Sequence, residues 1–141
     1  MKEHIAHTER LIHAPIQAVW AVLTTPDRHA VMMFGAEVET DWQVGSPITW
    51  SGTWEGKPFT DRGVITAVDE PTLLAVTHFS AMSGEDDRPE NYHAIEWRLE
   101  PIGSQTRVTL LQDGNATAEA AARAEANWAG SLDRLATMSA D

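Results

Sequence analysis

The chain has 141 residues, no cysteine, 43% hydrophobic residues and a formal net charge of −11 at pH 7. This composition is typical of globular proteins, and the length fits one domain covering residues 1–141. The missing cysteines exclude disulfides, thiolate nucleophiles and zinc–thiolate sites, and the negative charge disfavours nucleic acid and anionic membrane surfaces as partners.

The first thirty residues predict one strand followed by two short helices. Residues 5–13 alternate loosely and end at Ala14-Pro15, and proline suits the first turn of a helix. Apolar residues then recur at steps of three and four, as on one face of an amphipathic helix: Ile16, Val19, Trp20 and Leu23. A second short helix is expected over residues 27–31, after the break at Pro26.

The middle of the chain predicts strands joined by short turns. Large apolar residues occupy one parity of residues 48–54, while threonine and serine occupy the other, which is typical of a strand with one buried face. The expected strands cover residues 37–42, 48–54, 59–68, 73–81, 92–100 and 106–112. Residues 83–91 are expected to form a loop.

The last two dozen residues predict a long amphipathic helix that packs on this sheet. Its apolar residues fall at steps of three or four: Ala118, Ala121, Ala124, Trp128, Leu132, Leu135 and Met138. Thr117 is expected to cap it. The pattern predicts an α+β fold, a curved antiparallel sheet of about six or seven strands wrapped around a long C-terminal helix, with two short helices after the first strand.

Several segments, in this order, resemble the helix-grip, START-like (SRPBCC) superfamily, and within it the family related to the C-terminal domain of the activator of the Hsp90 ATPase. The matching segments cover essentially the whole chain: Ile12-His13-Ala14-Pro15, Val19-Trp20, Asp41-Trp42-Gln43-Val44-Gly45-Ser46, Gly63-Val64-Ile65, Glu96-Trp97-Arg98-Leu99-Glu100-Pro101 and Leu132-Asp133-Arg134-Leu135.

The resemblance implies a cavity between the sheet and the terminal helix. Superfamily members bind lipids, polyketides or hormones, cyclise substrates, or assist other proteins, so the resemblance does not choose among these functions. Two residues depart from the family pattern. His78 stands where the family often has a bulky aromatic residue, and Asn127 where it often has glycine before the helix tryptophan.

Aromatic and methionine side chains are the main candidates for ligand contacts. Six tryptophans are a high count, and an indole offers a large apolar surface with one N–H donor. The predicted ligand-binding residues are Met33, Phe34, Trp50, Trp54, Phe59, His78, His93, Trp97 and Trp128. The alternative is that the tryptophans and methionines simply fill the core.

Two histidines could add acid–base chemistry to the same cavity. His78 and His93 share strand parity with apolar residues, so both are expected on the inner face, where they could orient a ligand or act near neutral pH. Asp61 could be an inward carboxylate, whereas Glu96 and Arg98 should face outward. The alternative is that both histidines are satisfied polar residues at the cavity rim.

These observations favour a protein that binds a small apolar or aromatic ligand, with no catalytic residue assigned. The sequence contains no metal-binding, dinucleotide or phosphate-loop motif, so neither metal nor cofactor is expected. A co-chaperone-like or stress-response accessory and a cyclase, dehydratase or hydrolase remain alternatives, as do a homodimer and a protein partner. A cytoplasmic location is expected, since no signal peptide or membrane span is evident.

Overall fold

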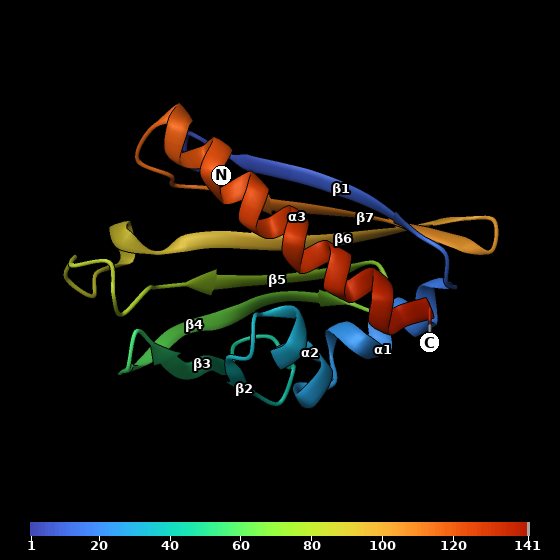
Figure 1. The fold of residues 1–141 in the computed structure, drawn as a ribbon, viewed down its shortest axis with the longest axis horizontal. Helices are drawn as coiled ribbons and strands as arrows, with labels where there is room; N and C mark the ends of the chain where they lie inside the picture. Colours follow the sequence, from blue (N-terminus) through green and yellow to red (C-terminus); the bar gives the residue numbers. More distant parts are fainter. Residues whose placement is uncertain (141) are drawn as a thin grey trace.

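A computed structural model describes residues 1–140 and contains one antiparallel sheet, one long helix and several short helices (Figure 1). The elements follow in the order β1 Ala6–Ile12, α1 Ile16–Leu23, α2 Pro26–Met32, β2 Glu37–Glu39, β3 Pro47–Trp54, β4 Lys57–Asp69, β5 Leu73–His78, a 3-10 turn at Pro89–Asn91, β6 His93–Ile102, β7 Gln105–Gln112 and α3 Ala118–Ala140.

The sheet has the strand order β1-β7-β6-β5-β4-β3-β2, with every neighbouring pair antiparallel. From β2 to β7, each strand lies beside the strand that follows it in the chain, as expected for consecutive antiparallel strands. The last strand, β7, also pairs with the first strand, β1. This architecture confirms the predicted α+β fold and the predicted strand count.

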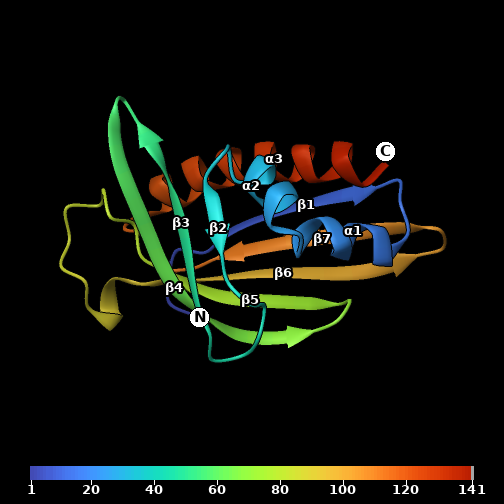
Figure 2. The ribbon, with the colours of Figure 1, turned by 90° about the horizontal axis from the view of Figure 1, so that it is seen from below.

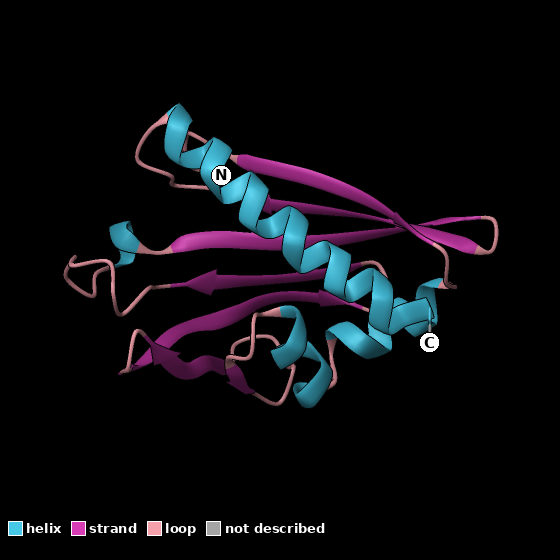
Figure 3. Ribbon diagram, in the orientation of Figure 1, coloured by secondary structure: helices cyan, strands magenta, loops and turns pink. Residues whose placement is uncertain are grey.

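Helix α3 crosses the sheet diagonally in Figure 3, and the turned view of Figure 2 shows it on the concave side of the sheet. Its apolar stripe packs inward, and Leu132 and Leu135 are fully buried. Thr117 precedes the helix and its hydroxyl accepts a hydrogen bond from the Ala120 N–H at 3.0 Å. The predicted cap is therefore confirmed.

Replacing Thr117 with alanine is expected to reduce the free energy of unfolding by about 1 kcal/mol, because a helix donor loses its acceptor. Urea denaturation followed by tryptophan fluorescence would measure this loss. Thr117→Ser retains the hydroxyl and serves as the control, and an equal loss in both variants would contradict the capping role.

The centre of the sheet–helix interface is filled by the chain's own side chains. Trp50 and Trp97 are 1% and 0% exposed, and they pack with aliphatic residues from the sheet, α1 and α3. Helices α1 and α2 cover the end of the sheet on which the C-terminal half of α3 lies (Figure 1). The opposite end of the concave face is less covered, and the hollows described below lie there.

One close backbone contact joins β4 and β5. A Cβ atom built on Gly63 would lie 2.6 Å from the carbonyl carbon of Thr77 and closer still to its oxygen. The Val64 N–H donates to the Thr77 hydroxyl at 3.0 Å beside this contact. Only glycine allows the two strands to approach so closely.

Two strands are clearly shorter than predicted, and other boundaries differ by one or two residues. Strand β5 ends at His78 rather than at residue 81. Strand β2 ends at Glu39 rather than at Trp42, because Trp42 takes a left-handed conformation with φ of 61° that an extended strand does not permit. Helix α2 is one residue longer at each end than expected. Among the helices of residues 1–140, none combines the length and apolarity needed to cross a membrane.

Candidate functional site

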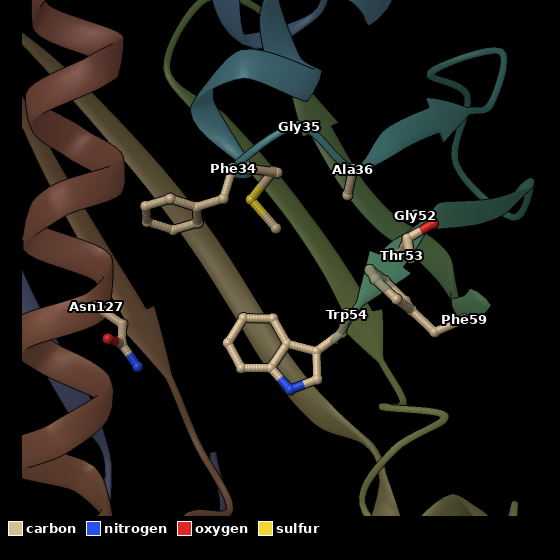
Figure 4. Close-up of a pocket in the computed structure, with 9 residues that line it drawn as sticks. Phe34, Gly35, Ala36, Gly52, Thr53, Trp54, Phe59 and Asn127 are labelled. Carbon is tan, nitrogen blue, oxygen red and sulfur yellow. The ribbon is translucent and has the colours of Figure 1, made fainter. Parts of the chain in front are cut away.

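A hollow of about 500 Å³ opens between the β3–β4 hairpin, the connection from α2 to β2, and α3 (Figure 4). The residues that line it are mostly apolar or small: Met33, Phe34, Gly35, Ala36, Gly52, Thr53, Trp54, Phe59 and Asn127. Phe34 and Trp54 are 56% and 60% exposed, so two large rings border this hollow with much of their surface open to solvent.

The hairpin places Trp54 at the rim because it extends beyond the covered part of the sheet. Trp54 is the last residue of β3 and pairs with Lys57, and the two residues between them, Glu55 and Gly56, have φ of 49° and 80°. Two successive positive φ angles are the geometry of a tight type I′ hairpin turn. The indole projects from the hairpin toward α3 in Figure 4.

Phe34 borders the hollow from the other side. Its φ of 59° is uncommon for an aromatic residue, and Gly35 follows with a φ of 90°. The guanidinium carbon of Arg134 lies 4.6 Å from the centre of the Phe34 ring, a cation–π arrangement. The short left-handed segment therefore turns the ring toward α3, where the arginine holds it.

A second hollow, of about 370 Å³, adjoins the first. It is lined by Trp54, Phe59, Asp61, Ser80 and Met82, so the two aromatic residues belong to both hollows. The second hollow differs from the first by its charged group, the Asp61 carboxylate. The combined site is an apolar surface with one polar end.

Asp61 is held by two hydrogen bonds. Its Oδ2 lies 3.0 Å from Nε2 of His78, and its Oδ1 accepts the Ala81 N–H at 2.9 Å. Both side chains of the Asp61–His78 pair are 16% exposed. Trp50, the register partner of Asp61 on β3, packs against the His78 imidazole with ring centres 5.1 Å apart. The other imidazole nitrogen, Nδ1, is buried without a hydrogen-bond partner.

His29 was not among the predicted site residues; it lies on the buried face of α2 and is 0% exposed. Its Nδ1 lies 2.8 Å from the Leu23 carbonyl oxygen, and its Nε2 lies 3.2 Å from the Trp50 indole nitrogen. Nδ1–H therefore donates to the carbonyl while Nε2 accepts the indole N–H, which fixes a neutral imidazole. Burial lowers the pKa of His29 from 6.5 to about 4, against a smaller opposing effect of the Leu23 hydrogen bond.

Four of the nine predicted ligand-binding residues line the first hollow: Met33, Phe34, Trp54 and Phe59. His78 contacts the second hollow's Asp61 without lining either hollow. The remaining four residues lie outside both hollows: Trp50, His93, Trp97 and Trp128.

These four residues make other contacts. Trp50 and Trp97 are core residues. His93 pairs with His78 in the strand register, and its Nδ1 lies 2.6 Å from the Asp113 carbonyl oxygen. The half-buried Trp128 donates its indole N–H to the Gln112 side chain at 2.9 Å. Core packing and local hydrogen bonds therefore occupy the four side chains.

Some lining residues were not predicted. Ala36, Gly52 and Thr53 carry no distinctive chemistry, and only the arrangement of the hairpin and the α2–β2 connection brings them together. Asn127 was noted as a departure from the family pattern, and it is the residue of α3 that faces the first hollow. Within residues 1–140, no three acidic or histidine side chains are grouped as metal ligands would be.

The family model described as "Activator of Hsp90 ATPase homolog 1-like protein" matches residues 13–140. Protein ChR145 from Cytophaga hutchinsonii is 37% identical, with a TM-score of 0.84, and the match covers 97% of this chain and 94% of that protein. Protein MLL2253 from Mesorhizobium loti is 20% identical, with a TM-score of 0.77 and 95% of each chain covered.

CalU16 from Micromonospora echinospora shares the fold at 19% identity and a TM-score of 0.73, over 96% of this chain and 75% of its own. Among curated proteins, none matches this chain significantly. The family model nevertheless spans most of the sequence, and a 37% identical protein shares the fold over nearly its full length. The chain therefore belongs to the Activator of Hsp90 ATPase homolog 1-like family, within the START-like, helix-grip superfamily.

Proposed function

We propose that this protein binds a small, mainly apolar ligand in the first hollow, with Phe34, Trp54 and Phe59 as the principal contacts. The observation that carries the proposal is the exposure of Phe34 and Trp54 on facing sides of a hollow of about 500 Å³. Ligand sites in proteins commonly have volumes of about 300–1,000 Å³ and mostly apolar linings.

The hydrophobic effect favours covering the exposed Phe34 and Trp54 rings, which supports this proposal. Each exposed ring leaves apolar surface in contact with water, and covering such surface is worth roughly 25 cal/mol per Å². The protein's own side chains leave more than half of Phe34 and of Trp54 exposed, at 56% and 60%, whereas Trp50 and Trp97 in the adjacent core are almost fully covered. A flat apolar molecule between Phe34 and Trp54 would gain this burial without unpacking the core.

Binding can be tested with N-phenyl-1-naphthylamine, a neutral apolar dye whose emission rises when it leaves water. The wild-type protein is expected to bind the dye. Trp54→Ala should weaken binding about tenfold or more, because a large aromatic contact is removed. The measurement is a fluorescence titration of the dye at fixed protein concentration.

Val44→Ala is the matched control, because Val44 is 62% exposed and lies outside both hollows. It should leave the dye affinity unchanged. Absence of dye binding by the wild-type protein, or equal binding by wild type and Trp54→Ala, would refute the proposed function.

A further inference from the structure

We propose that Asp61 is the polar anchor of this site, and that the preferred ligand joins its apolar body to a hydrogen-bond donor, a hydroxyl or a protonated amine. The inference rests on the proposed function, because it specifies the chemistry of the ligand that the same site would bind.

Asp61 lies next to the aromatic residues of the proposed binding site. It lines the second hollow, whose other walls include Trp54 and Phe59, the two residues shared with the first hollow. Phe59 and Asp61 are two residues apart on β4 and so face the same side of the sheet. A ligand that lies against these two rings therefore reaches the carboxylate with one end.

The Asp61 carboxylate has hydrogen-bond acceptor positions that the protein does not fill. A carboxylate offers about four acceptor positions, and the structure fills two of them, with His78 and the Ala81 N–H. No lysine or arginine in residues 1–140 forms an ion pair with Asp61. Acceptor capacity therefore remains at the end of a hollow whose other polar side chain is Ser80.

The same charge distribution excludes anionic ligands. A carboxylate or phosphate at this end would face Asp61 without a guanidinium or ammonium to offset the repulsion. The net charge of −11 adds an unfavourable field of the same sign. Fatty-acid-like and other anionic molecules are therefore poor ligands for this site, whereas phenols, alcohols and amines of similar shape are favoured.

His78 acts as a positioning residue for this anchor. It bonds one carboxylate oxygen while the Ala81 N–H bonds the other, and its own ring packs edge-on against the buried Trp50. Both oxygens are thus oriented before a ligand arrives. Pre-oriented groups lose less entropy on binding, which strengthens discrimination by a single hydrogen bond.

Three naphthalenes of similar shape test the inference by calorimetric titration: 2-naphthol, which donates a hydrogen bond, 2-methoxynaphthalene, which does not, and 2-naphthoate, which is anionic. Wild-type protein should bind 2-naphthol about tenfold or more tightly than 2-methoxynaphthalene, as expected for a hydrogen bond to a charged group, and should bind 2-naphthoate most weakly. Asp61→Asn should reduce the preference for 2-naphthol severalfold while leaving the affinity for 2-methoxynaphthalene nearly unchanged.

Asp69→Asn is the matched control, because Asp69 is the exposed last residue of the same strand. It should preserve the wild-type order of the three ligands. The ratio of two affinities within one variant is insensitive to a partly unfolded fraction, so a loss of stability in Asp61→Asn would not mimic the expected result.

The outcomes separate the inference from the proposed function. If wild-type protein binds 2-naphthol and 2-methoxynaphthalene equally well, and Trp54→Ala weakens the binding of both, the role of Asp61 is overturned while the proposed binding site stands. Tightest binding of 2-naphthoate would also overturn it. If none of the three binds and the neutral dye does not bind either, the proposed function fails together with the inference.

Discussion

Gly63→Ala is expected to lower the free energy of unfolding by about 3 kcal/mol or more, since overpacking of a well-packed interior costs roughly 1–3 kcal/mol and occasionally more. The added methyl would meet the backbone carbonyl of Thr77 in the neighbouring strand. A backbone group in a paired strand cannot rotate away as a side chain can. The strands must therefore separate, which weakens the pairing of β4 with β5.

The measurement is urea denaturation, which would show a lower midpoint, or loss of soluble folded protein if the remaining stability is too small. Gly130→Ala is the matched control. Its Cβ would lie 3.8 Å from the Phe34 ring, an ordinary contact, within helix α3. Alanine is favoured over glycine in a helix by about 1 kcal/mol, so this variant should be slightly more stable. Wild-type stability in Gly63→Ala would contradict the close contact between β4 and β5.

Acidification from pH 7 to pH 4 is expected to remove about 3 kcal/mol of stability through His29 alone. Its pKa is lowered to about 4 in the folded protein, against 6.5 for an unperturbed histidine. At pH values between about 4 and 6.5, His29 binds a proton in the unfolded chain but not in the folded protein. Stability therefore rises with pH across this window, and it falls as the pH decreases from about 6.5 to 4.

The effect can be isolated with His29→Gln, which removes the titration but keeps a donor for the Leu23 carbonyl and an acceptor for the Trp50 indole. The variant should be less stable than wild type at pH 7. Its further loss of stability between pH 7 and pH 4 should be smaller by about 3 kcal/mol, because the five other histidines and all carboxylates remain in both proteins. Equal losses in the two proteins would exclude His29 as the source.

The fold could be predicted from the sequence because its determinants are periodic and local. The alternation around Trp50 identified a strand with one buried face, and the three-to-four spacing around Leu132 identified the covered face of α3. The cap at Thr117 depends on a hydroxyl immediately before the helix, which the sequence shows directly. Boundaries shifted where one residue took an unusual conformation, as Trp42 did.

The site was less predictable because it depends on how far each element extends in space. Trp50 and Trp54 have the same parity on one strand, yet one is buried and the other exposed, because the hairpin runs past the cover provided by the rest of the fold. His29 could have been found from its spacing to Met32, since residues three apart share one face of a helix and both are buried. The contact between Asp61 and His78 requires the register of three strands, which no local pattern reveals.

Trp54, together with Phe59, is shared by the two hollows, and this position affects the size of the molecule that can be accommodated. Trp54 lines both the first hollow and the hollow that contains Asp61, and it is 60% exposed. A change in the side-chain torsion of Trp54 would therefore alter the shape of both hollows at once. The size of the molecule that this site accommodates is therefore sensitive to the conformation of one exposed side chain at the end of the β3–β4 hairpin, without any movement of the sheet.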